Sequence, residues 1–266
     1  MKPIIKWNFW QRRWSIFWWC VAIFVFIGLN LIFYPSIRDQ AAQLNESLNQ
    51  LPDAARSLFS DTADLLSPVG YLSSQVFYLM LPMLLGILTI GLGSSLLAKE
   101  ENEGTIELLL ARSLSRGSLL LGKIFAGLAI LLAVGTIALV TTVGFSWGVD
   151  INVGLINIAL ASVMAMTMGL LFGAVAFYLT ALGRWGRPAS IGIAAAVAIG
   201  SYLVTSLVPL AQWLNWPAKF LPYHYYHPGD VLAGKFSAGN FLLLLSASLI
   251  LGVLSWIAFR RRDTGA

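Results

Sequence analysis

The clearest candidate metal ligands in this sequence lie in the segment YHYYHPGD, which holds His224, His227 and Asp230 at intervals of three residues. Imidazole and carboxylate groups are common zinc ligands, so these three residues could form a metal site. The tyrosines and prolines around them are instead typical of a chain that lies at a membrane surface. We therefore expect no bound metal here, and no catalytic residue elsewhere in the chain.

A second chemically suggestive pattern is GSLLLGKI, from Gly117 to Ile124. It comes within one residue of the phosphate-binding loop G-x-x-x-x-G-K-S/T, in which the final hydroxyl binds magnesium. Ile124 has no hydroxyl, no strand is predicted before the pattern, and its leucines continue into an apolar helix. The sequence therefore predicts that this chain carries no nucleotide cofactor of its own.

Composition excludes a soluble enzyme. Hydrophobic residues make up 58% of the 266 positions and charged residues 11%, with a mean hydropathy of +0.78. An average soluble domain carries roughly 25% charged residues. The formal charge of +5 does not indicate a nucleic-acid partner, because the basic residues lie at the edges of apolar blocks and form no continuous stripe. We expect membrane lipid as the surroundings instead.

Six uncharged stretches are long enough to cross a bilayer, which takes about 20 helical residues. They are residues 14–34, 71–98, 124–147, 154–182, 189–209 and 241–259. The sequence therefore predicts an all-α membrane protein with one domain, residues 1–266. Its outer loops would be residues 35–70 and 210–240, and residues 99–123 would connect the second and third spans.

The basic residues predict the orientation of these spans. If the N-terminus is cytoplasmic, 13 of the 17 Lys and Arg residues lie on the cytoplasmic side, as the positive-inside rule requires. Six spans also place both termini on that side. We therefore expect a multi-pass protein of the plasma membrane with both termini in the cytoplasm.

The N-terminal segment MKPIIKWNFWQRRW alternates aromatic and basic residues. This pattern predicts a short helix in the cytoplasmic membrane interface, with a disordered basic tail as the alternative. The second outer loop is also rich in aromatics, which we expect at the headgroup level. These are Trp213, Trp216, Phe220, Tyr223, Tyr225 and Tyr226.

Two further patterns concern the spans themselves. G-x-x-x-G occurs from Gly144 to Gly148 and from Gly169 to Gly173, and both predict close helix packing. None of the six predicted spans contains an ionisable residue, whereas an ion-coupled transporter or an intramembrane protease would need some. Any energy for transport would then come from outside this chain.

The connection at residues 99–123 has the character of a docking helix. Its acidic residues, including Glu100, Glu103 and Glu107, come first and Arg112 and Arg116 come later, an order that suits the helix dipole. The apolar residues between them, Ile106, Leu109 and Leu110, have spacings that place them on one edge of a helix. A solvated loop with chance amphipathicity is the alternative.

The run from Glu103 to Arg116, followed by Gly122 and Lys123, resembles the cytoplasmic segment after the second span of type-2 ABC transporter permeases. The likeness extends to Leu51-Pro52, to the phrase SPVGYL at residues 67–72, to the six-span layout and to the length. One departure is Ser113, where such permeases commonly have proline.

The resemblance implies an ABC transporter permease subunit, expected to be an exporter and not itself an enzyme. It implies a second permease chain, as a homodimer or a related heterodimer, and two copies of a P-loop ATPase subunit that bind ATP and Mg. The residues expected to bind that ATPase form a coupling helix: Glu100, Glu103, Gly104, Thr105, Ile106, Glu107, Leu109, Leu110, Arg112 and Arg116. The alternative is a non-transport membrane anchor or assembly subunit that recruits a soluble partner. Neither the residues nor the resemblance indicates a substrate.

Overall fold

The computed structural model describes residues 2–40, 66–102, 116–183 and 186–261. Within these ranges the chain forms helices and turns and no strand. Six of the described helical segments are long and apolar enough to cross a membrane. The predicted all-α membrane fold is confirmed.

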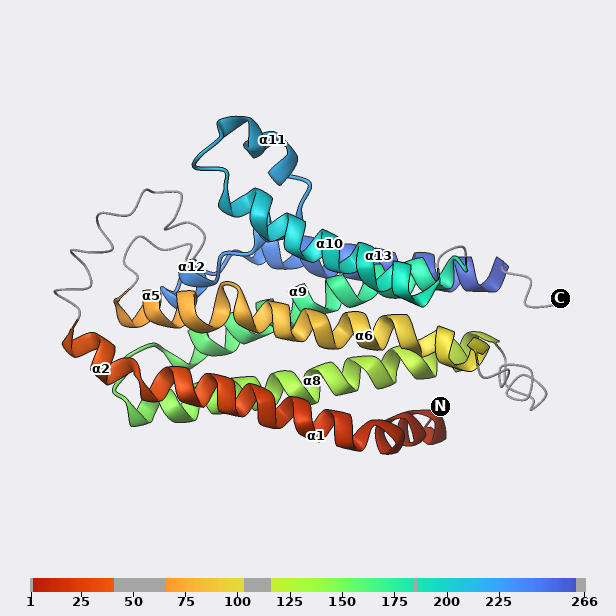
Figure 1. The fold of residues 1–266 in the computed structure, drawn as a ribbon, viewed down its shortest axis with the longest axis horizontal. Coiled ribbons are helices and arrows are strands. Elements are labelled where there is room, and N and C mark those ends of the chain that lie inside the picture. Colours follow the sequence, from red (N-terminus) through yellow and green to blue (C-terminus); the bar gives the residue numbers. More distant parts are fainter. Residues whose placement is uncertain (1, 41–65, 103–115, 184–185, 262–266) are drawn as a thin grey trace.

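The long helices lie side by side along the length of the molecule (Figure 1). They are α1 (Lys2–Ile32), α6 (Met80–Asn102), α8 (Arg116–Gly148), α9 (Leu155–Ala181), α10 (Arg187–Ser206) and α13 (Ala238–Arg261). Short helices lie in the connections: α2 (Tyr34–Asp39), α5 (Pro68–Leu72), α11 (Asn215–Ala218) and α12 (Pro228–Leu232). In Figure 1, α2 and α5 lie at the end opposite the chain termini, and α11 projects away from the bundle. Long apolar runs become helices in a bilayer because a helix satisfies its backbone polar groups internally.

Helices α6 and α9 form the centre of the bundle and share its most extensive helix–helix contact. Glycines make this contact close: a Cβ atom added to Gly173 would lie 2.6 Å from the Cβ of Thr89. One added to Gly169 would lie 2.9 Å from the Cβ of Leu85. The predicted close packing is therefore confirmed for Gly169 and Gly173. It is wrong for Gly144 and Gly148, where an added Cβ would meet no atom within 4 Å among the described residues.

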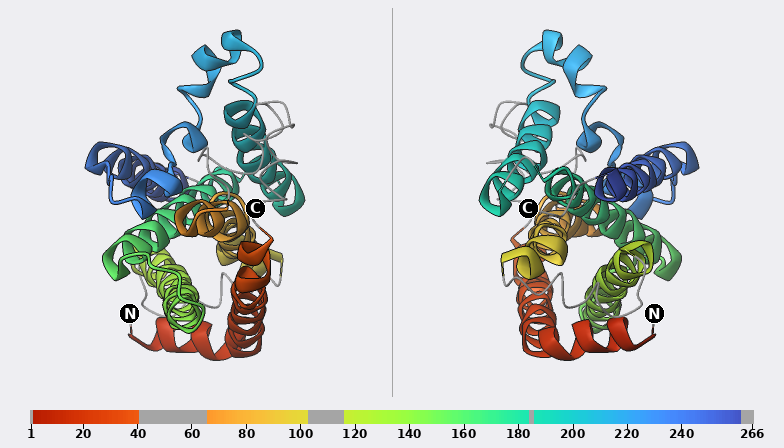
Figure 2. Two further views of the ribbon diagram at one scale, coloured as in Figure 1. Left: turned by 90° about the vertical axis from the view of Figure 1, so that its left-hand side faces the viewer. Right: turned by 90° about the vertical axis from the view of Figure 1, so that its right-hand side faces the viewer.

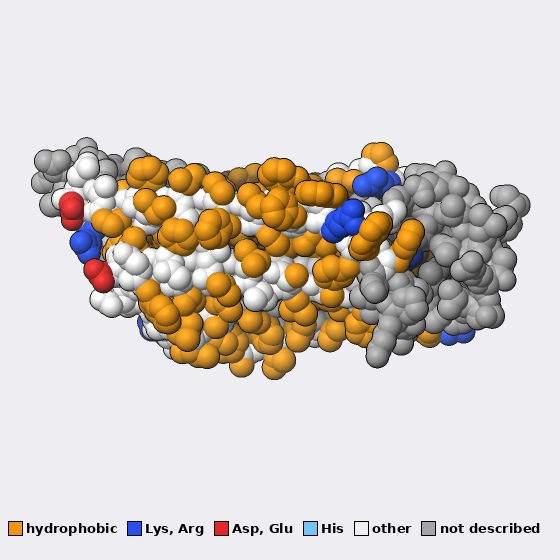
Figure 3. All heavy atoms as spheres, turned by 90° about the horizontal axis from the view of Figure 1, so that it is seen from below, with side chains coloured by type: hydrophobic (Ala, Val, Ile, Leu, Met, Phe, Trp, Pro, Cys, Tyr) orange, Lys and Arg blue, Asp and Glu red, His pale blue; other side chains and the backbone are white. Residues whose placement is uncertain are grey.

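Helices α1 and α13 are peripheral, because α1 packs mainly on α8 and α13 mainly on α9. The apolar window of the first span is 22% buried and that of the last is 17% buried, against 67% for the span that contains α6. Figure 3 shows the apolar side chains that cover one face of the bundle. Such a surface suits a lipid environment.

The N-terminal segment is helical but is not a separate element, since α1 continues without a break from Lys2 into the first span. Figure 2 shows its first part running across the bundle, whereas the remainder of α1 is seen nearly end-on. Trp7, Trp10 and Trp14 are exposed, and the guanidinium of Arg13 lies 4.0 Å from the ring centroid of Trp10. Exposed tryptophans beside arginine are typical of a helix in the membrane interface.

One expectation for the second outer loop, that all its aromatic residues lie at the headgroup level, is wrong. Trp213, Trp216 and Phe220 are exposed as predicted, but Tyr223 and Tyr226 are only 1% and 0% exposed. The chain folds back into the end of the bundle at these tyrosines, because their large rings gain more from packing in the core than from the interface. Residues 41–65 of the first outer loop lie outside the described residues.

A second correction concerns charges in the spans. Helix α8 begins at Arg116 rather than near residue 124, so Lys123 lies inside a helix, with 2% of its surface exposed. The apolar residues before Lys123 allow the helix to start earlier than the uncharged run. Ionisable residues therefore do occur in the spanning helices, at their ends.

Candidate coupling site

The structure places the two flanks of the predicted coupling helix. Glu100 lies in the last turn of α6, which ends at Asn102, and Arg116 is the first residue of α8. The other predicted site residues lie outside the described residues. They are Glu103, Gly104, Thr105, Ile106, Glu107, Leu109, Leu110 and Arg112.

Both flanks lie at the same end of the bundle as the start of α1 and the end of α13 (Figure 1). The connection from α9 to α10 is at this end as well. Residues 2, 102, 116 and 261 therefore share one side of the bundle, as six spans require. The chain between residues 102 and 116 therefore starts and ends on this side, where a soluble partner would have access.

A small second core stabilises this end, and sequence reasoning missed it. Leu120 at the start of α8 packs with Phe177 and Ala181 at the end of α9, and with Phe259 at the end of α13. Trp256 packs on the edge of this cluster. The four-residue spacing of Phe177 and Ala181 in α9 was a visible signal, but it did not show which helices meet there. These contacts join the start of α8 to the ends of α9 and α13.

Cationic groups gather at this end and contact the bundle. The Nη2 of Arg12 donates a 2.8 Å hydrogen bond to the Oγ of Ser95, which joins α1 to α6. The guanidinium of Arg260 lies 4.6 Å from the ring centroid of Trp256, within the range of a cation–π interaction. Figure 3 shows Lys and Arg side chains near this end of the apolar surface.

The helix that precedes residues 103–115 is tied into the centre of the bundle. The Oγ1 of Thr89 in α6 donates a hydrogen bond of 2.5 Å to the carbonyl oxygen of Gly169 in α9. The glycine contacts described above leave no room for the two helices to slide without displacing backbone. We therefore expect α6 and α9 to move as one body.

The histidine segment lies at the opposite end. Among the described residues, no group of three His, Cys, Asp or Glu side chains could hold a metal ion. Burial lowers the pKa of His224, and the nearby His227 and Lys219 lower it further. These effects favour the neutral imidazole of His224.

A bundle of six helices that could each span a membrane, with the described chain ends at one end of the bundle, is the architecture of a multi-pass membrane protein. A family model described as "ABC-2 family transporter protein" matches residues 4–264, so this chain belongs to that family. It is the non-enzymatic transmembrane component of an ABC transporter, and the resemblance drawn from residues 103–123 is confirmed. Searches of curated proteins and of solved structures found no significant match.

Proposed function

We propose that this permease is the membrane subunit of an exporter, driven by a separate P-loop ATPase that docks on residues 99–123. The observation that carries the proposal is the packing of the helix that leads into this segment. Residues 99–102 end α6, whose span is the most buried of the six candidate spans, and α6 packs closely on α9 through Thr89 and the glycines. Force applied at the segment would therefore reach the centre of the bundle.

The proposed assembly has two permease chains, each with one ATPase subunit, and both termini in the cytoplasm. The distribution of 13 of the 17 cations toward the end with the termini supports this orientation. The exposed apolar faces of α1, α10 and α13 leave room for a second permease chain within the membrane. ATP and Mg would bind only on the ATPase subunits.

The rival proposal, a membrane anchor that recruits a soluble partner without transport, also needs a docking segment. It does not need a rigid connection from that segment into the bundle. The two proposals differ in one measurable outcome, which is whether the membrane chain changes the rate of ATP hydrolysis by the partner.

The test uses three variants of the segment, co-expressed with the candidate ATPase. Leu109→Asp places an unpaired charge in the proposed contact, which costs about 3–5 kcal/mol when such a charge is buried. We expect loss of co-purification and of stimulated ATP hydrolysis. Glu103→Lys should act more mildly, because a charge at the rim changes association more than total affinity. Gly104→Val should impair coupling through the backbone conformation that glycine permits.

Leu48→Asp, in the first outer loop, is the matched control and should leave both the complex and its ATPase activity intact. All variants should still insert in the membrane, since none lies in a span. Retention of partner binding and of stimulated hydrolysis by all three segment variants would remove residues 99–123 as the docking site.

A further inference from the structure

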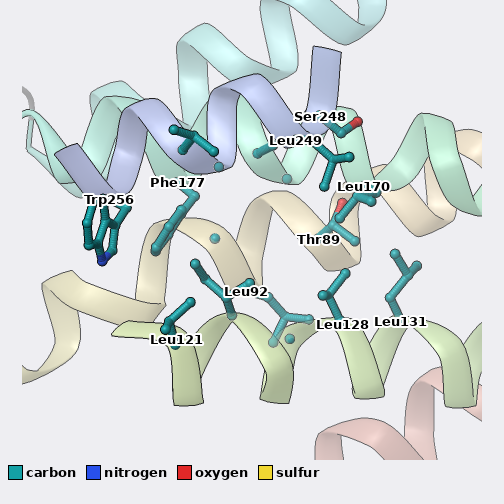
Figure 4. A pocket seen from close by; sticks show the side chains of 17 residues that line it. Thr89, Leu92, Leu121, Leu128, Leu131, Leu170, Phe177, Ser248, Leu249 and Trp256 are labelled. Carbon is teal, nitrogen blue, oxygen red and sulfur yellow. The ribbon is translucent and has the colours of Figure 1, made fainter. Parts of the chain in front are cut away.

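A cavity of about 470 Å³ lies between α6, α8, α9 and α13. Figure 4 shows Leu92, Leu121, Leu128 and Leu131 on one side of it, and Leu249 and Trp256 of α13 on another. This volume is in the range of ordinary ligand pockets. The cavity exists because α13 packs on α9 and hardly touches α8.

The lining of the cavity is suited only to an apolar ligand. Its two hydroxyl side chains, Thr89 and Ser248, already donate hydrogen bonds within the bundle, Ser248 to the carbonyl oxygen of Leu244 at 2.9 Å. The remaining lining residues have apolar side chains or are glycines, apart from the indole N–H of Trp256. A polar ligand would lose its hydration here without gaining partners.

The mouth of the cavity faces the membrane interior. Three of its lining residues are also exposed on the outside of the bundle: Leu121 at 40%, Leu249 at 60% and Val253 at 56%. Deeper lining residues such as Leu131 and Phe177 are buried. A ligand would therefore enter sideways, between α8 and α13, from the hydrocarbon core of the bilayer.

The length of the cavity along α8, and its place along the bundle, match the hydrocarbon region of one leaflet. Its lining on α8 runs from Leu121 to Leu131, which is about 15 Å at 1.5 Å per residue. The hydrocarbon core of a bilayer is about 30 Å thick, so each leaflet occupies about half of that distance. The cavity lies toward the end of the bundle that carries the termini, since Leu121 is near the start of α8 and Trp256 is near the end of α13.

A cationic side chain lies at the position expected for the lipid headgroup. Arg260 is exposed, lies one helical turn beyond Trp256 and stacks on its ring at 4.6 Å. Tryptophan and arginine at the end of a span mark the interface, and arginine there attracts anionic lipids.

We propose that this cavity binds one acyl chain of an anionic glycerophospholipid, with the headgroup beside Arg260. The lipid comes from the leaflet at the end with the termini, which is the cytoplasmic leaflet in the orientation proposed above. Binding requires neither the ATPase nor transport. The proposal therefore goes beyond the function assigned to residues 99–123 and can fail or succeed independently of it.

The test places the purified full-length chain in phosphatidylcholine nanodiscs that contain a small fraction of phosphatidylglycerol with a photoactivatable diazirine in its acyl chain. After illumination, mass spectrometry locates the labelled residues. We expect label on the cavity lining of α8 and α13, and competition by excess unlabelled phosphatidylglycerol. Label spread evenly over all lipid-facing helices, or a crosslink between two copies of the chain in its place, would overturn the proposal.

Two glycines provide a matched pair of variants. A Cβ added to Gly252, in the cavity wall, meets no atom within 4 Å, so Gly252→Leu should fill the cavity without a clash. Gly144 on α8 is equally unobstructed but does not line the cavity. We expect a several-fold loss of cavity labelling in Gly252→Leu and none in Gly144→Leu. Equal labelling in both variants would show that the lipid does not occupy the cavity.

The headgroup is tested with the same diazirine chain on phosphatidylcholine. The unaltered protein should label more strongly with the phosphatidylglycerol probe, and Arg260→Gln should reduce that labelling to the phosphatidylcholine level. If the two probes label the unaltered protein equally, the anionic part of the proposal is wrong.

Discussion

The phenol hydroxyl of Tyr226 donates a hydrogen bond of 2.7 Å to the main-chain carbonyl oxygen of Phe77, 149 positions earlier in the chain. Phe77 ends a π-helical turn, Ser73–Phe77, in which the N–H of Tyr78 bonds to the carbonyl oxygen of Ser73 at 2.7 Å. The second outer loop thereby supplies a donor at an irregular turn in the second span. This bond ties the loop to the core of the bundle.

We expect Tyr226→Phe to lower the free energy of unfolding by about 1–3 kcal/mol, because it removes a buried donor and leaves the carbonyl of Phe77 without that partner. Tyr223→Phe is the matched control. The hydroxyl of Tyr223 is buried with no hydrogen-bond partner among the described residues, so its removal should be neutral or stabilising. Thermal unfolding in detergent compares the two. Equal destabilisation by both changes would show that ring packing alone holds the loop.

Two glycines on α6 test the contact with α9. A Cβ on Gly93 would collide with the carbonyl oxygen of Gly173, which is backbone and cannot rotate away. We expect Gly93→Ala to destabilise the protein by about 1–3 kcal/mol, as overpacking does. Gly91→Ala, two residues earlier, meets nothing within 4 Å and should be neutral or stabilising, since alanine is a better helix former. Similar melting temperatures for both variants would argue against the close contact.

The proposed orientation can be tested with a cysteine reagent that does not cross membranes. Cys20 is the single cysteine, so Cys20→Ser gives a clean background. In intact cells, Ser47→Cys should be labelled and Ser115→Cys should not. The proposed orientation, which puts 13 of the 17 Lys and Arg residues on the cytoplasmic side, places residue 47 outside and residue 115 in the cytoplasm. Permeabilised cells provide the control, in which both variants should react. Labelling of Ser115→Cys from outside would reverse the proposed topology.

The lowered pKa of His224 predicts a pH dependence in the second outer loop. In the unfolded chain this histidine titrates near its ordinary pKa of about 6.5, so the unfolded state binds the proton more readily. The contribution of His224 to the stability of the folded state is therefore fully present above about pH 6.5. It falls as the pH decreases toward the lower pKa of the folded state. His224→Gln should flatten this slope, measured by amide exchange of the loop between pH 5 and 7.5. An unchanged slope would assign the pH dependence to other groups.

Local composition was enough to predict the spans, because a charge-free run of the right length has few other folds available in a bilayer. The Gly169 and Gly173 contact was also visible, since small residues at that spacing form a flat helix face. The burial of Tyr223 and Tyr226 was not visible. Both lie in the same aromatic loop as the exposed Trp213 and Trp216. What distinguishes them is contact with residues far away in the sequence, Phe77 for Tyr226 and Phe172 for Tyr223.

For the candidate site, too, some features follow from the sequence and others depend on tertiary packing. Charge order and apolar spacing predict a docking helix at residues 99–123, most of which lies outside the described residues. The small core of Leu120, Phe177, Ala181 and Phe259 depends instead on how three helix ends meet. The cavity beside α13 depends on the gap between α13 and α8, which no pattern within either helix specifies. Such features arise from tertiary packing, so a sequence without aligned relatives does not reveal them.

The close pairing of α6 with α9 also has a consequence for biogenesis. Thr89 and Gly169 are 80 residues apart, and α8 must be synthesised between them. At synthesis rates of about 5–20 residues per second, α6 waits on the order of 4–16 seconds in the membrane before its partner emerges. During that interval its glycine-rich face meets lipid or a chaperone. The rate of synthesis through residues 90–169 thus sets how long the central helix of the bundle remains unassembled.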